Sequence, residues 1–180
     1  TLDEQMRDVL QFLPGVFDQK IRKIVMNKSY RNTMEIARYA EKLTGVKDVE
    51  LLKRHGKEVV EEQFQTEDAV LDEILSKAKL GEDEYETAAI ITMTEAEASI
   101  LYQILKARGE EVHYIDRNSS VFKKGLTVTT FYLAKGLEFD QVFALYTTQD
   151  DTPLHRQARY ICATRALHEL YMYEVKASQD

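Results

Sequence analysis

The continuous apolar run AAIITM at residues 88–93 constrains the fold more than any other segment of the chain. A strand whose residues are all apolar has to be covered on both faces, which is typical of a parallel sheet between layers of helices. Thr94 follows as a predicted N-cap, and Glu97 completes a capping box for a helix that runs to about Ala107. Gly109 is predicted to end this helix. The run therefore predicts the first half of a βαβ unit.

The same alternation of strand and helix extends along the whole chain. Further strands are predicted at residues 21–27, 59–60 (a short edge strand), 111–115, 126–131, 141–146 and 169–175. Residues 1–20 are predicted to form one amphipathic helix and a turn at Pro14-Gly15. Further helices are predicted at residues 33–43, from a cap at Thr66 to a stop at Gly81, and at 153–166. Strands that alternate with helices imply a mainly parallel sheet. The predicted fold class is therefore α/β, with a sheet flanked by helices in three layers.

The charge is uneven. The chain has 24 Lys plus Arg against 31 Asp plus Glu, a formal charge of −7. Residues 41–86 hold 14 acidic and 7 basic residues, which leaves 17 of each sign elsewhere. A net negative charge argues against nucleic-acid binding by bulk electrostatics. Because the chain outside residues 41–86 is neutral, nucleic-acid binding by another part of the surface remains an open hypothesis.

Several site classes are excluded. The single Cys162 permits neither an internal disulfide nor a cysteine-based zinc site, and it fits a reducing compartment. No apolar run approaches the ~20 residues of a membrane span. The patterns GxxxxGK[ST], GxGxxG and GxSxG are absent, and the closest histidines, His155 and His168, are 13 positions apart. The sequence predicts no metal ligands and no self-contained catalytic site.

Three segments carry a functional signal: KSYRNT at 28–33, TFYLAKGLEFD at 130–140 and YICATRA at 160–166. In this order they resemble motifs IV, V and VI of the superfamily 1 helicases of the UvrD/Rep type, whose usual forms are NYRS, TxxxAKGLEF and YVALTRA. AKGLEF and TRA match completely. The resemblance implies that residues 1–180 form one C-terminal RecA-like domain, a P-loop NTPase-like fold that lacks the P-loop. The N-terminal ATPase domain is expected to be absent from this chain.

The resemblance also implies nucleotide-binding residues. Arg31 and Arg165 match the two arginines that reach the γ-phosphate of ATP on the partner RecA-like domain, as arginine fingers. Glu138 matches the carboxylate that binds the ribose. Gly136 matches a glycine where the backbone approaches the ligand closely. Tyr30 matches a position of the same site that mostly holds its loop in place, and so does Lys135.

For nucleic acid, Thr130 matches a threonine beside the strand-binding track. The family usually has His-Ser before AKGLEF, where this chain has Tyr132 and Leu133. Leu133 cannot hydrogen-bond a phosphate. Tyr132 is predicted either to stack on a base or to pack within the domain. In addition, only 104 positions separate Arg31 from Lys135, so the accessory domain that large members insert there is absent.

These departures point to a compact branch of the family. The first hypothesis is that the parent protein is a bacterial, cytoplasmic, ATP-dependent DNA helicase. ATP and Mg²⁺ would be held mainly by its N-terminal RecA-like domain, and single-stranded DNA would be a partner. The alternative is a helicase-like ATPase that remodels or recycles RNA polymerase. A third reading, a flavodoxin-like binding module without an ATPase partner, leaves the three motifs unexplained. The isolated chain is expected to hydrolyse no ATP.

Overall fold

The computed structural model describes residues 32–45, 55–118 and 123–177. The predicted helix at 1–20, the predicted strand at 21–27, and Tyr30 and Arg31 lie outside these ranges. Six strands are described: β1 (Val60–Phe64), β2 (Thr87–Thr92), β3 (Val112–Tyr114), β4 (Gly125–Thr130), β5 (Phe139–Thr147) and β6 (Ala166–Val175). They form one sheet in the order β1-β6-β5-β2-β4-β3, and every neighbouring pair is parallel.

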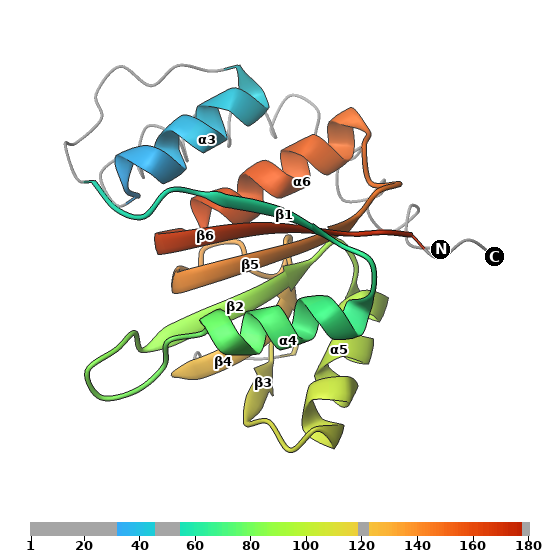
Figure 1. The fold of residues 1–180 in the computed structure, drawn as a ribbon. Coiled ribbons are helices and arrows are strands. Elements are labelled where there is room, and N and C mark those ends of the chain that lie inside the picture. Colours follow the sequence, from blue (N-terminus) through green and yellow to red (C-terminus); the bar gives the residue numbers. More distant parts are fainter. Residues whose placement is uncertain (1–31, 46–54, 119–122, 178–180) are drawn as a thin grey trace.

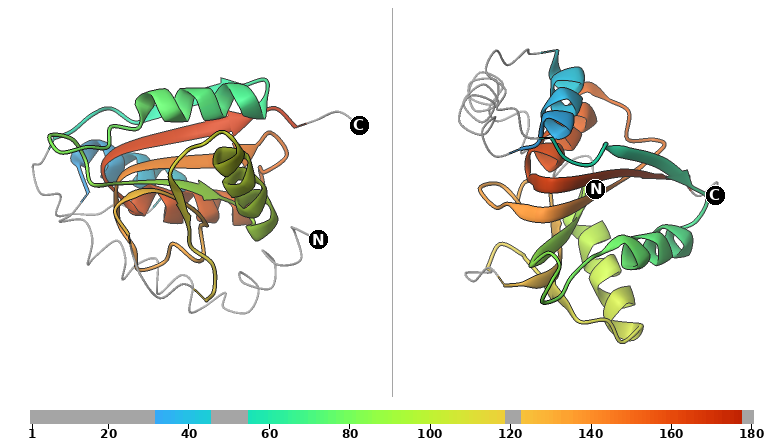
Figure 2. Two further views of the ribbon diagram at one scale, coloured as in Figure 1. Left: turned by 90° about the horizontal axis from the view of Figure 1, so that it is seen from below. Right: turned by 60° about the vertical axis from the view of Figure 1, so that its left-hand side comes forward.

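Helices cover both faces of the sheet. They are α3 (Met34–Thr44), α4 (Glu67–Lys77), α5 (Glu95–Ala107) and α6 (Pro153–Thr164). Figure 1 shows α3 and α6 on one face and α4 and α5 on the other, and Figure 2 shows the three layers from two further sides. The predicted three-layer α/β class is therefore confirmed. None of the helices among the described residues is long and apolar enough to span a membrane.

The apolar run becomes the central strand β2, and its side chains alternate between two cores. Ala89 and Ile91 pack with residues of α3 and α6, whereas Ala88 and Ile90 pack with residues of α4 and α5. All six residues of β2 are buried. The period of two along a strand explains why both sets of alternating side chains, Ala88 and Ile90 on one face and Ala89 and Ile91 on the other, are apolar: both faces of β2 are inside the protein.

Threonine hydroxyls begin the helices as the sequence predicts. The side chains of Thr33, Thr66 and Thr94 each accept a hydrogen bond from an amide of the first helical turn, over 3.2–3.3 Å. Such a bond satisfies one of the amides that has no partner inside the helix. The predicted caps at Thr66 and Thr94 are confirmed; of the two candidates for α3, Asn32 and Thr33, Thr33 is the cap, and α6 is capped in the same way by Thr152.

Two predicted strands are too short: β1 extends to Phe64 and not only to Val60, and β5 begins at Phe139 and not at Gln141. Two further predicted boundaries, both at helix ends, are also wrong. The helix α4 ends at Lys77 and not near Gly81, because the side chain of Gln141 on β5 binds the Lys77 carbonyl (3.0 Å) and the Lys79 amide (2.9 Å). The helix α6 ends at Thr164, and β6 begins at Ala166, three residues earlier than predicted, because Ala166 already pairs with Phe139 of β5. In both cases a neighbouring strand, and not the local sequence, sets the boundary.

A carboxylate fastens the first residues of β2 to β5. The Asp140 side chain accepts hydrogen bonds from the Glu86 amide, the Thr87 amide and the Thr87 hydroxyl, all within 3.1–3.2 Å. The Asp140 amide in turn donates to the Thr87 hydroxyl over 3.0 Å. These bonds tie two strands whose starts are far apart in the sequence.

The substitution Asp140→Ala leaves the part-buried Thr87 amide and hydroxyl without this acceptor. We expect the free energy of unfolding to fall by about 2 kcal/mol, the usual cost of unsatisfied buried polar groups. Urea unfolding followed by circular dichroism measures the change. Asp83→Ala, in the exposed loop before β2, is the matched control, with a change of about 0.5 kcal/mol or less. An equal effect of the two substitutions would contradict the fastening role.

Candidate functional site

The structure divides the predicted site residues between the two edges of the sheet. Thr130 ends β4, and Tyr132 follows it at the carboxyl edge. Glu138 directly precedes β5, and Arg165 directly precedes β6, so both lie at the amino edge. Ligands of α/β sheets usually bind at the carboxyl ends of strands. Glu138 and Arg165 therefore lie at the edge opposite to that usual position.

Motifs V and VI meet at the amino edge. The Phe139 amide donates to the Arg165 carbonyl over 2.9 Å, which joins the start of β5 to the start of β6. One guanidinium nitrogen of Arg165 (Nη1) donates to the Leu137 carbonyl, and another (Nη2) donates to the Thr164 hydroxyl, both over 3.3 Å. The AKGLEF and TRA segments, predicted to belong to one site, are therefore brought together by the structure.

The Arg165 side chain is only partly satisfied. The residue is 1% exposed, and its Nε has no hydrogen-bond partner among the described residues. Burial lowers the pKa of the Arg165 guanidinium, and the charge of the nearby Glu138 opposes this shift. A buried cation with an unpaired N–H donor lowers the stability of the fold unless an anion or another acceptor binds that donor. The guanidinium is therefore suited to receive a further acceptor.

The described end of the motif IV segment reaches the same place. The side-chain amide of Asn32 donates to the Ala166 carbonyl over 2.9 Å, next in sequence to Arg165. Asn32 is buried, and Thr33 beside it caps α3. Arg31 and Tyr30 lie outside the described residues, so their roles stay predictions. Asn32 was not predicted as a site residue, although its position inside the motif segment was a signal for it.

The loop that carries motif V runs from one edge of the sheet to the other. Phe131 and Ala134 are buried in the core on the side of α3 and α6, whereas Lys135 and Gly136 are exposed. Gly136 has φ +83°, and a Cβ atom there would meet no atom within 4 Å. Backbone conformation, and not close packing within the domain, accounts for glycine at this position.

The hydroxyls of Thr130 and Tyr132 lie next to each other. Thr130 is fully buried, and the Tyr132 hydroxyl interacts with the side chains of Thr130 and Arg117. Burial raises the pKa of Tyr132, as does the charge of Glu95. The Tyr132 ring packs edge-on against Phe131, with 5.2 Å between ring centroids. The packing alternative for Tyr132 is therefore observed, and base stacking stays a prediction.

Glu169, a buried carboxylate that was not predicted from the sequence, lies near the amino edge on the face of the sheet that α4 and α5 cover. Glu169 is 4% exposed and accepts hydrogen bonds from the Tyr171 hydroxyl and from Gln141. Burial alone would raise the pKa of Glu169, but bonds from Tyr171 and Tyr85 hold it below its usual value. The alternation of β6 was a signal, because Glu169 is in phase with the inward-facing Tyr171. Its bonds fasten elements together, as those of Asp140 do.

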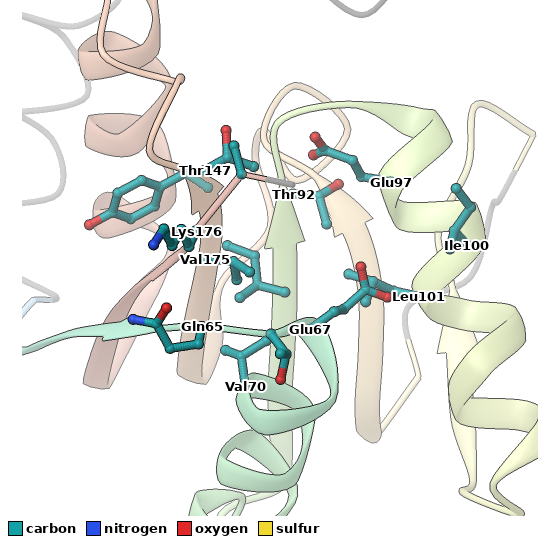
Figure 3. Close-up of a pocket in the computed structure, with 14 residues that line it drawn as sticks. Gln65, Glu67, Val70, Thr92, Glu97, Ile100, Leu101, Thr147, Val175 and Lys176 are labelled. Carbon is teal, nitrogen blue, oxygen red and sulfur yellow. The ribbon is translucent and has the colours of Figure 1, made fainter. Parts of the chain in front are cut away.

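The carboxyl edge holds a crevice of about 360 Å³ between the first turns of α4 and α5 and the ends of β2, β5 and β6 (Figure 3). Val70, Leu101 and Leu145 line it, and Glu97 lies on its rim. Burial, followed by the charge of Asp150, raises the pKa of Glu97 to about 7. No group of three or more potential metal ligands is found among the described residues.

Comparison with known proteins identifies the class of the domain. Residues 125–173 match the model of the UvrD-like helicase C-terminal domain. The crystal structure of the C-terminal domain of a possible DNA helicase from Lactobacillus plantarum WCFS1 shares 30% identity and a TM-score of 0.62; the alignment covers 81% of this chain and 87% of that one. No curated protein matches the chain.

A complex of an arterivirus helicase, nonstructural protein 10, with DNA is also similar, at 13% identity and a TM-score of 0.40. That alignment covers 63% of this chain and 28% of that one, and the score is too low to bear on function. The parallel sheet and the junction of motifs V and VI define a helicase C-terminal domain of the α/β class. The chain belongs to the family of UvrD-like helicase C-terminal domains.

The raised pKa of Glu97 predicts a pH-dependent stability. The folded state holds this proton up to about pH 7, whereas the unfolded chain releases it near the ordinary value of 4.5. Between these values the folded state binds more protons, so the free energy of unfolding falls as pH rises, by on the order of 2 kcal/mol. Glu97→Gln preserves the capping pattern and should remove this part of the pH dependence.

Urea unfolding at several values between pH 5 and pH 8 measures the effect. Glu67→Gln, which changes an exposed carboxylate of the same crevice, is the matched control and should leave the wild-type slope in place. A Glu97→Gln protein with the wild-type slope would refute the assignment.

Proposed function

We propose that this chain is the C-terminal domain of an ATP-dependent DNA helicase and that it supplies Arg165, together with Arg31, to ATP on a separate N-terminal RecA-like domain. The observation that carries the proposal is the buried Arg165 guanidinium with an open Nε donor, held where the AKGLEF and TRA segments meet. The contact of Asn32 with Ala166 supports it, because it brings the end of the motif IV segment to the same place.

The donor set at this junction fits a phosphate. A guanidinium offers a planar fork of N–H donors that phosphate oxygens accept, and the positive charge would neutralise charge that develops during phosphoryl transfer. Arg165 is 1% exposed, so its side chain or its surroundings must shift for it to reach a nucleotide on another domain. Glu138, beside Arg165 at the same edge, would accept a hydrogen bond from the ribose.

The motif V loop connects the proposed nucleotide site to the proposed nucleic-acid track. It joins Thr130 and Tyr132 at the carboxyl edge to Glu138 at the amino edge, and its Phe131 and Ala134 are buried in the core between them. A loop packed in this way transmits a displacement at one end to the other. We infer that single-stranded DNA passes Thr130 and Tyr132, and that closure on ATP shifts this end of the loop.

Arg165→Ala in the full-length parent protein should lower the ATPase rate by on the order of 10³-fold, in the range known for arginine fingers. Arg165→Lys should restore little activity, because an ammonium lacks the planar fork. Arg108→Ala is the matched control: Arg108 is exposed, pairs with Asp68 and Asp72, and lies directly after the last residue of α5. Steady-state ATP hydrolysis measures all three proteins, with the isolated chain expected to be inactive.

An Arg165→Ala protein that is folded and hydrolyses ATP at the wild-type rate would contradict the proposed role. Circular dichroism provides the test of folding. Single-turnover kinetics then separate the chemical step from nucleotide binding, since an arginine finger acts mainly on the former.

A second candidate is a helicase-like ATPase that remodels or recycles RNA polymerase. Two observations favour it. Leu133 replaces a residue that contacts nucleic acid in typical members, and the elements β1 to β4 already occupy residues 60–130, where large members carry an accessory domain.

The two candidates differ in what the parent protein does with ATP. A helicase should unwind a tailed DNA duplex without another protein. A remodelling ATPase should unwind it poorly and should release RNA polymerase from a stalled complex in an ATP-dependent manner. Strand separation measured by fluorescence, with polymerase release measured in parallel, decides between them; efficient unwinding without polymerase release would reject the second candidate.

A further inference from the structure

The crevice at the carboxyl edge has an apolar interior that opens to the surface. Val70, Leu101, Leu145 and Val175 line it from α4, α5, β5 and β6. Ile100 stands on its wall and is 56% exposed, the largest exposure of a large hydrophobic side chain among the described residues. Figure 3 shows Val70 on α4, Ile100 and Leu101 on α5, and Val175 between the two helices. Covering such a wall with an apolar group removes apolar surface from water and therefore stabilises the complex.

Acidic groups surround this apolar floor. Glu67 and Glu97 lie on its two sides, at the first turns of α4 and α5. A second cavity of about 280 Å³ meets the crevice at Tyr146 and Thr147, and its lining adds four further carboxylates: Glu61, Asp150, Asp151 and Glu174.

The cations on this surface do not balance the acids. The two cavities are lined by six acidic side chains, which are Glu97, with a pKa of about 7, and five others, and by two cations, Lys176 and Arg159. Arg159 is already engaged, because it donates to the Asp150 carbonyl (3.2 Å), pairs with Asp151 (3.9 Å) and lies over the Tyr146 ring. The pKa of Glu97 is raised by burial and, in addition, by the negative charge of Asp150. A phosphate backbone would be repelled here, and a positive group would be attracted.

We propose that this crevice docks a basic segment of a partner protein, which places an apolar side chain against Ile100 and the floor and a Lys or Arg between Glu67 and Glu97. The occupant follows from the two chemistries present together. An apolar floor alone would take any hydrophobic group, and the acids alone would take any cation, whereas the pair selects a segment that carries both, side by side. The site is separate from the Arg165 junction, so it does not depend on the proposed ATPase role.

The test uses the 180-residue chain labelled with ¹⁵N and a capped pentapeptide, KLLKK, as the probe. Titration followed by amide chemical shifts should give the largest changes around Glu97, Ile100 and Val175. Two control peptides, ELLEE and KGGKK, each lack one of the two required chemistries and should bind about tenfold more weakly, about 1.4 kcal/mol.

Two surface substitutions locate the binding. Ile100→Ala should weaken binding of KLLKK by about threefold or more, through lost apolar contact. Glu67→Lys should weaken it by about fivefold, and the difference should shrink at high salt. Glu110→Lys makes the same charge change at an exposed position beyond the far end of α5 and should leave binding within about twofold of the wild type.

Several outcomes would overturn the proposal. They are shifts spread evenly over the surface, equal binding of KLLKK and either control peptide, and equal effects of Glu67→Lys and Glu110→Lys. Because all three variants are measured on folded protein with resolved amide spectra, a failure to fold is seen directly and is not mistaken for loss of binding.

Discussion

The pairing of β5 with β6 at their first residues is the contact on which the rest of the structure depends. The Phe139 amide bonds to the Arg165 carbonyl, and Phe139 and Ala166 stand opposite each other in the register of the two strands. AKGLEF leads into one strand and TRA leads into the other, so this one pairing places Arg165 against the Leu137 carbonyl. A slip by one residue would turn the buried side chains of a strand to the wrong face. The core therefore holds the geometry of the junction.

The two edges of the sheet differ in chemistry for a physical reason. All described strands are parallel, so α4 and α5 both begin at the carboxyl edge. Acidic residues in a first helical turn are stabilised by the positive end of the helix dipole, and Glu67, Glu95 and Glu97 occupy such positions. Negative charge collects around the crevice between the first turns of α4 and α5 as a result. The carboxylates at the amino edge, Asp140 and Glu169, instead accept hydrogen bonds that tie neighbouring strands and loops together.

Much of the fold was predictable because its signals are local. Thr66 and Thr94 begin helices through their own hydroxyls. Residues 88–92 lie in the central strand β2, because they are apolar or, for Thr92, buried with a hydroxyl that donates to the Thr94 carbonyl. The boundaries that prediction missed depend on partners distant in sequence. Gln141 ends α4 from 64 positions away, and no pattern near Lys77 announces it. In the same way, β6 begins at Ala166 because β5 is there to pair with it.

The sequence by itself determined the α/β class and the motif segments, because periodicity, capping residues and short motifs are properties of neighbouring residues. Only the tertiary structure decided where those segments lie. It put Arg165 and Glu138 at the amino edge and Thr130 at the carboxyl edge, with one loop between them. It also joined Glu67 of α4 and Glu97 of α5 across an apolar crevice. Such placements follow from the crossover connections and the register of the sheet, which depend on contacts between residues far apart along the chain.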